Sequence, residues 1–155
     1  MISVDYNKNE PYILMADDDD DDSLFITAAF KEVGLMGAIK RVNNGEELIV
    51  QLKELIEKKE SLPSLILLDL NMPKKNGKEA LKIIKGDIRF KQIPVIVYST
   101  SSTKSDIMES YSLGCNGFIV KPNDYHEIEK IAQKIKLFFT EITLANPENQ
   151  PEFFL

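Results

Sequence analysis

The sequence predicts an α/β protein with an open, doubly wound sheet of five parallel strands, a (βα)5 arrangement. Short apolar runs alternate five times with helical patterns along the 155 residues, and this order is typical of a parallel sheet. The runs at 65–68 and 94–98 are apolar almost throughout, as expected for strands buried on both faces. The length is that of one domain, and 43% of apolar residues suffices for one core.

Each expected strand is a short apolar run that ends at a polar residue or a turn signal. The first ends at a series of aspartates, the second at an Asn-Asn-Gly turn, the third at Asp69, the fourth at Ser99 and the last at Lys121. The second run contains charged residues, which predicts a half-buried strand. The five strands are expected over residues 12–16, 38–42, 65–68, 94–98 and 118–120.

Each expected helix shows apolar residues at helical spacing between these strands. In the second helix, Leu48, Leu52 and Leu55 recur at the i, i+4 and i+7 positions. Gly34 and Gly114 follow the first and fourth helices, where a C-terminal cap belongs. The third helix is short and the last is amphipathic. The five helices are expected over residues 23–33, 46–59, 78–85, 102–113 and 125–139.

The composition excludes several classes of protein. No segment approaches the roughly 18 apolar residues of a membrane span, and the N-terminus lacks the basic and apolar parts of a signal peptide. Cys115 is the single cysteine, so an internal disulfide is impossible and a cytoplasmic location is expected. The net charge is −6, which is the charge of the six consecutive aspartates at 17–22, so the rest of the chain is neutral overall. A pI near 4.9 argues against DNA binding, which needs a basic surface.

Ionisable or hydroxyl side chains follow four of the five strands. Doubly wound sheets bind ligands at the carboxyl ends of their strands, so these side chains are expected to meet there. Carboxylates at one edge repel one another unless a cation lies among them, and Mg²⁺ takes carboxylate, carbonyl and water oxygens. The sequence therefore predicts a Mg²⁺ site, while residues 19–22 are expected to form a solvated helix start. The strand-end side chains are Asp17, Asp18, Asp69, Ser99 and Lys121.

Asp69 is predicted to be a nucleophile toward a phosphoryl group. It ends the most apolar strand and, beside a metal, its carboxylate can form an acyl phosphate. The reaction also needs a further cation or hydroxyl, which Lys121 and Ser99 can supply. An EF-hand is excluded because Asp22, rather than glycine, is the sixth residue counted from Asp17.

Four short motifs in chain order resemble the receiver domains of two-component response regulators. They are ILMADD at 13–18, LLDLNMP at 67–73 with Gly77, VYS at 97–99, and GFIVKP at 117–122. The resemblance covers residues 12–139 and implies a flavodoxin-like (CheY-like) fold. The branch of single-domain receivers that includes the regulators paired with bacterial phytochromes is most similar, because it shares the aspartate-rich first loop.

The resemblance implies a phosphoacceptor and a metal site. Asp69 would accept the phosphoryl group. Asp17, Asp18, Asp69 and the backbone carbonyl of Asn71 would hold Mg²⁺, with Asp18 as a direct ligand.

The resemblance also implies a switch. Ser99 would follow the phosphoryl group on activation, and Lys121 would pair with it. Phe118 matches the aromatic switch position, where a phenyl ring would act by packing because it has no hydroxyl. The Lys121–Pro122 peptide bond would be cis, since cis bonds are largely confined to proline.

The implied function is that of a stand-alone receiver in a phosphorelay, not an enzyme acting on external substrates. Its partners would be a sensor histidine kinase, including the phytochrome-like kind, or a histidine phosphotransfer protein, with neither DNA nor a membrane involved. A pseudo-receiver acting as an interaction module is the alternative, although Asp69 and Lys121 are both present. A haloacid-dehalogenase-like phosphatase fits less well, because Asn71 stands where it needs a second aspartate. A P-loop is excluded because Met72 stands at the position of its first glycine.

The expected domain boundaries leave short segments at both ends. Residues 1–11 form an N-terminal extension, residues 12–140 the receiver, and residues 141–155 a C-terminal tail. The tail contains Phe153 and Phe154, which would either pack back on the domain or join a homodimer contact. The sequence leaves both arrangements open.

Overall fold

The computed structural model describes residues 11–35 and 39–140, whose strands form one parallel sheet. The strand order is β2-β1-β3-β4-β5, so the chain builds outward from β1 first on one side and then on the other. This order confirms the predicted doubly wound (βα)5 fold. The strands are β1 (Ile13–Ala16), β2 (Ile39–Val42), β3 (Leu65–Leu68), β4 (Val95–Ser99) and β5 (Gly117–Val120).

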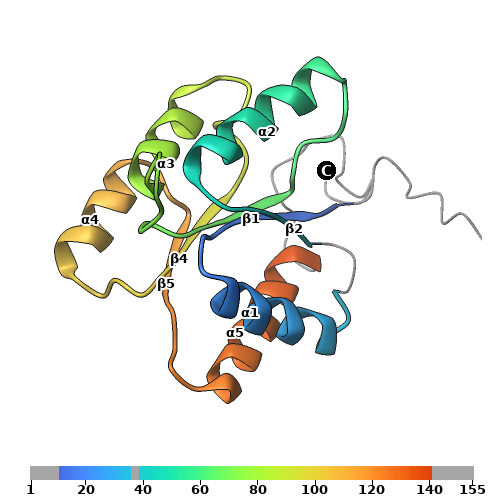
Figure 1. The fold of residues 1–155 in the computed structure, drawn as a ribbon, viewed down its shortest axis with the longest axis vertical. Helices are drawn as coiled ribbons and strands as arrows, with labels where there is room; N and C mark the ends of the chain where they lie inside the picture. The colour runs from blue at the N-terminus through green and yellow to red at the C-terminus, as the bar shows by residue number, and fades with distance from the viewer. Residues whose placement is uncertain (1–10, 36–38, 141–155) are drawn as a thin grey trace, which may run out of the picture.

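Helices cover both faces of the sheet. Figure 1 shows α1 and α5 on one side and α2 and α3 on the other, with α4 beside α3. In the part of the chain that the structure describes, none of the helices combines the length and apolarity that a membrane crossing requires. The helices are α1 (Asp20–Glu32), α2 (Gly45–Glu57), α3 (Gly77–Gly86), α4 (Lys104–Ser112) and α5 (Tyr125–Thr140).

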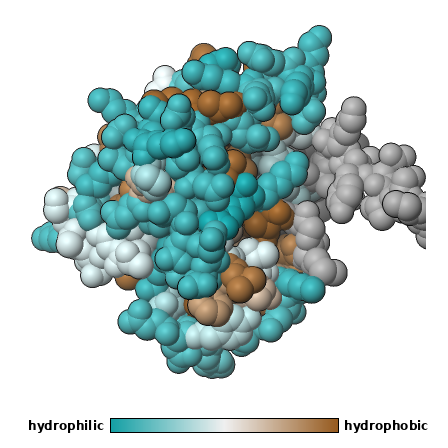
Figure 2. All heavy atoms as spheres, viewed as in Figure 1, coloured by the Kyte–Doolittle hydropathy of each residue, from teal (hydrophilic) through white to brown (hydrophobic). Residues whose placement is uncertain are grey.

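The central strand β3 contributes to two apolar cores. Ile66 and Leu68 belong to the core under α2 and α3, whereas Leu65 and Leu67 belong to the core under α1 and α5. None of the four side chains is more than 1% exposed. An unbroken apolar run predicts this double burial, because a parallel strand covered on both faces has no polar side. The face of the molecule seen in Figure 2 is mainly hydrophilic, with small apolar patches.

The start of α1 differs from the sequence expectation and bears on the site. The helix begins at Asp20 rather than at residue 23, because the Asp19 carboxylate accepts the backbone N–H of Asp22 at 2.9 Å. Such a side-chain cap fixes the first helical turn. The end of α1 is as expected, since Gly34 has a φ of +91°, the left-handed conformation that closes a helix. The earlier start places Asp22 in the first turn.

The expected strand 65–68 coincides with β3, and, apart from α1, the remaining expected elements differ from the observed ones by at most two residues at either end. α4 begins at Lys104 rather than at residue 102, because the Thr103 hydroxyl caps it by accepting the backbone N–H of Asp106. Ala38 of the expected second strand, residues 1–10 of the expected extension and the tail 141–155 lie outside the described residues. The domain boundaries therefore stay predictions, as do the two arrangements of the tail.

Candidate functional site

Three charged side chains meet where β1, β3 and β5 end. Asp17, Asp69 and Lys121 each follow one of these strands directly, and all three are buried. Lys121 Nζ donates to Asp17 Oδ2 at 2.8 Å and to Asp69 Oδ2 at 3.1 Å. This edge is the switch point of the sheet, because the strands that follow β1 lie on its two opposite sides. The structure thus brings together three of the residues that the sequence places at strand ends.

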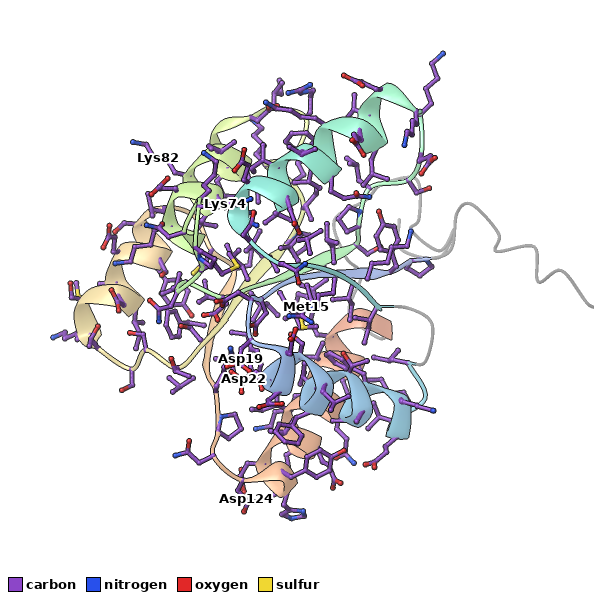
Figure 3. The ribbon with its side chains drawn as sticks, in the orientation of Figure 1. Met15, Asp19, Asp22, Lys74, Lys82 and Asp124 are labelled. Carbon is purple, nitrogen blue, oxygen red and sulfur yellow. The ribbon has the colours of Figure 1, made fainter. Side chains whose placement is uncertain are left out.

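A fourth charged residue, Asp22, completes this cluster. Its Oδ2 accepts a hydrogen bond from Lys121 Nζ at 2.8 Å, although the sequence pattern assigned it to a solvated helix start. Figure 3 shows Asp22 at the start of α1, near the chain segment that follows β5. The cap at Asp19 makes Asp22 the third residue of the helix, but nothing in the acidic run itself indicates a contact with Lys121.

Asp17, Asp18 and Asp69 are the candidate metal ligands that the described residues bring together. One carboxylate oxygen of each lies within 4.8 Å of the others. Asp18 is exposed and the other two are buried, so water can reach the outer side. Carboxylates with retained waters are the ligands that Mg²⁺ takes, so the set fits this ion. Asn71, the further expected ligand, donates its backbone N–H to Asp69 Oδ1 at 3.2 Å.

Negative charge exceeds positive charge in this cluster. Burial raises the pKa of Asp17 and the charge of Asp69 raises it further, against hydrogen bonds from Lys121 and the Asp19 backbone that lower it. Burial alone would lower the pKa of Lys121, but its hydrogen bonds to Asp17 and Asp22 outweigh burial and raise this pKa. Several carboxylates around one ammonium favour the binding of a divalent cation.

Ser99 and Phe118 lie on the two strands beyond β3. Ser99 is the last residue of β4 and fully buried, and its Oγ accepts the backbone N–H of Ser101 at 3.3 Å. Phe118, on β5, is half-buried and packs against the core under α2 and α3. The switch roles of both residues stay predictions.

Polar contacts link the loop after β4 to α4 and α3. Ser101 Oγ donates to the Asp106 carboxylate, which also accepts from Lys78 Nζ at 2.6 Å. Lys78 Nζ reaches Glu109 Oε2 as well, at 2.6 Å. The hydrogen bonds from Lys78 and Ser101 hold the pKa of Asp106 down at about 2. Within α4 the buried residue is Ser110, so these polar contacts are an important part of its attachment.

Gly77, the first residue of α3, lies against the backbone of Asp69. A Cβ at this position would be 2.1 Å from the Asp69 carbonyl oxygen and 2.6 Å from the Leu70 Cα. The Gly77 N–H donates to the Leu70 carbonyl at 3.0 Å. The chain turns back over Asp69 so closely that a side chain has no room, which explains the glycine.

The Lys121–Pro122 peptide bond is trans, so the expected cis bond is wrong. The part of the chain that the structure describes contains no cis peptide bond. A bond before proline favours trans by about 0.5–1 kcal/mol. With the trans bond, Lys121 Nζ already reaches its carboxylates, and the Lys121 N–H donates to the Ser99 carbonyl at 2.7 Å. The trans isomer is therefore sufficient for these contacts of Lys121.

Comparisons with known sequences agree with the motifs. The response regulator receiver domain family matches residues 13–133. FilR2 of Methanothrix harundinacea, a probable methanogenesis regulatory protein, is 31% identical over 131 residues, which is 84% of each chain. The response regulator Rcp1 of Synechocystis sp. is 43% identical over 79 residues, covering 51% of this chain and 54% of Rcp1.

Two solved structures show the same fold. The phosphorylated cyanobacterial phytochrome response regulator RcpA has a TM-score of 0.81 and 34% identity, covering 88% of this chain and 99% of that chain. The Mn²⁺-bound form of Rcp1 has a TM-score of 0.80 and 32% identity, covering 88% of this chain and 100% of that chain. Both resemblances extend over nearly all of the elements described above.

Proposed function

The chain belongs to the response regulator receiver family, and from this premise we propose that Asp69 accepts a phosphoryl group. The donor is a phosphohistidine of a sensor histidine kinase or a histidine phosphotransfer protein. An Asp69 oxygen attacks phosphorus, the bond from phosphorus to the histidine nitrogen breaks, and that nitrogen keeps the electron pair. The observation that supports this most strongly is the buried Asp69 carboxylate beside the Lys121 ammonium at the switch point.

The surrounding groups orient the acceptor and balance charge. Asn71 N–H binds one Asp69 oxygen and Lys121 Nζ binds the other, so the carboxylate has one orientation. Lys121 would donate to a phosphoryl oxygen as charge develops there. Asp17, Asp18, Asp69 and the Asn71 carbonyl would hold Mg²⁺, which when bound neutralises the phosphoryl oxygens.

The proposed switch acts through the loop after β4. A phosphoryl group adds charge and acceptor oxygens, which attract the Ser99 hydroxyl. Ser99 accepts from the Ser101 N–H, and Ser101 donates to Asp106 on α4, so a movement of Ser99 has a direct route to α4. Phe118 repacks on the neighbouring strand. Partners that bind the α4 surface would then distinguish the two states.

The partner class follows from the family. Receiver domains are phosphorylated by histidine kinases, and RcpA is a phytochrome response regulator. We therefore propose a phytochrome-like kinase as the donor and a cytoplasmic location. The receiver, residues 12–140, would act by changing its binding partners, without DNA contact or catalysis on external substrates.

The test is the intact mass of the protein after incubation with acetyl phosphate and Mg²⁺. The native protein should gain one phosphoryl group, whereas Asp69→Asn and a Mg²⁺-free sample should gain none. Asp124→Asn is the matched control, because Asp124 is an exposed acid at the start of α5, away from the cluster. It should be phosphorylated like the native protein.

Two outcomes would contradict the proposal. Uptake by Asp69→Asn at the native rate would show that another residue is the acceptor. No uptake by the native protein, either from acetyl phosphate or from phosphorylated histidine kinases, would favour the interaction module instead.

A further inference from the structure

The Lys121 ammonium is shared among three carboxylates from three different elements. Nζ donates to Asp17 after β1, to Asp22 in α1 and to Asp69 after β3. An ammonium has three protons, so these bonds use its whole donor capacity. The side chain of Lys121 is 5% exposed, and its position is therefore set by these partners and by the packing around its stem.

Two of the three partners have a second task. Asp17 and Asp69 both belong to the candidate metal group, and Asp69 is the proposed phosphoacceptor. A carboxylate oxygen of Asp17 or Asp69 that binds a cation or lies against a phosphoryl group is less available to accept from Lys121. Asp22 does not belong to that group, so its bond to Lys121 is free of this competition.

The backbones on both sides of the Asp22–Lys121 bond are fixed. The Asp22 N–H is bound by the Asp19 carboxylate at 2.9 Å, which anchors the first turn of α1. The Lys121 N–H donates to the Ser99 carbonyl at 2.7 Å, which anchors the segment after β5. The bond at 2.8 Å between the two side chains thus joins two rigid points, as a positioning contact requires.

We propose that Asp22 is a positioning residue, which keeps the Lys121 ammonium beside Asp69 while Asp17 and Asp69 engage a metal ion and the phosphoryl group. This inference rests on the proposed phosphoryl transfer to Asp69. Asp22 itself touches neither the acceptor nor, in this role, the phosphoryl group. It acts through Lys121.

The neighbouring residue Asp21 provides a matched control. Asp21 lies in the same first turn of α1 and has the same charge, but it is exposed. If Asp22 contributed charge at a helix start and nothing else, Asp21→Ala and Asp22→Ala would have similar effects. If Asp22 positions Lys121, Asp22→Ala will differ from Asp21→Ala.

The kinetic test compares phosphorylation by acetyl phosphate at saturating Mg²⁺. Asp22→Ala should lower the maximal rate about tenfold, with the half-saturating donor concentration nearly unchanged, because Lys121 loses orientation rather than the donor its binding site. Asp22→Asn should restore most of the rate, since its amide oxygen still accepts from Lys121. Asp21→Ala should match the native protein. Equal rates in all four proteins, or faster rates in both Asp22 variants, would overturn the inference.

A second measurement does not depend on phosphorylation. In protein with ¹⁵N-labelled lysine, the Lys121 ammonium should give an exchange-protected NMR signal in the native protein and in Asp21→Ala, with and without Mg²⁺. The signal should be lost in Asp22→Ala when Mg²⁺ is present. An unchanged signal would overturn the inference. If the native protein takes up no phosphoryl group but the signal depends on Asp22, then the proposed function fails while the hold on Lys121 stands.

Discussion

The close approach of Gly77 to Asp69 makes Gly77→Ala a sharp test of how the acceptor is placed. The added Cβ would lie 2.1 Å from the Asp69 carbonyl oxygen, whereas ordinary contact begins at 3.4 Å. One of the two atoms must therefore move by about 1.3 Å. Since both atoms belong to backbone next to the acceptor, this shift displaces Asp69 itself.

The size of the effect follows from this overlap. Overpacking of this kind costs about 1–3 kcal/mol, and a loss of about 2 kcal/mol lowers the folding equilibrium constant about 30-fold. A displacement of about 1 Å at a reacting group lowers its rate about 100-fold. We therefore expect Gly77→Ala to lose both stability and phosphorylation. Gly86→Ala, at the other end of α3, has no atom within 4 Å of its Cβ and should be neutral or more stable by up to about 1 kcal/mol.

Two assays measure these effects separately. Urea unfolding followed by circular dichroism gives the free energy of unfolding of the native protein and both variants. Intact mass after incubation with acetyl phosphate and Mg²⁺ gives the phosphorylation rate under conditions where each protein is folded. The reasoning would be refuted if Gly77→Ala were as stable as Gly86→Ala and were phosphorylated at the native rate.

Two further predictions concern pH and the attachment of α4. The Tyr12 hydroxyl donates to the Ser61 carbonyl at 2.7 Å, and burial together with the charge of Glu60 raises its pKa to about 12. The unfolded chain releases this proton near pH 10, so the contribution of Tyr12 to stability should fall as pH rises from 10 to 12, by about 1.4 kcal/mol at pH 11. Tyr12→Phe should lack this part of the fall and keep the part due to the buried Tyr98, whose pKa is also raised to about 12. A stability difference from the native protein that is constant from pH 8 to 11 would contradict the assignment. Lys78→Met should change the unfolding free energy by less than about 1 kcal/mol, because its ion pairs are partly exposed, yet speed amide hydrogen exchange in α4. Unchanged exchange in α4 would show that the Lys78 contacts do not hold this helix.

The fold and the main strand-end residues could be predicted from local sequence. An apolar run such as 65–68 defines a doubly buried strand by itself, and parallel strands bring their carboxyl ends to one edge. Asp17, Asp69 and Lys121 meet for this reason, although they are distant in the chain. The four receiver motifs predicted the family, and the match of residues 13–133 to the response regulator receiver family confirms this prediction.

The predictions that were wrong depend on where a helix begins and on contacts with residues far away in the sequence. Asp22 was assigned to solvent because nothing in the run 17–22 shows which acids point inward. That choice depends on the cap at Asp19, which starts the helix, and on Lys121, 99 residues later. The isomer of the Lys121–Pro122 bond was predicted from the family resemblance, and nothing local in the chain specifies the rarer form.

The shallow burial of α4 sets the energy scale of the proposed switch. Moving a two-state equilibrium from 1:99 to 99:1 takes about 5.5 kcal/mol, which two or three charge-assisted hydrogen bonds to a phosphoryl group can supply. Exposing one large apolar side chain costs about 1.5–3 kcal/mol. Moving a helix that is held by several such side chains would therefore cost as much free energy as the phosphoryl group supplies. α4 buries Ser110 and leaves Met108 and Tyr111 largely exposed. Because little apolar surface holds α4, we expect phosphorylation to be able to shift it, and small changes in its polar contacts would adjust how far the equilibrium moves.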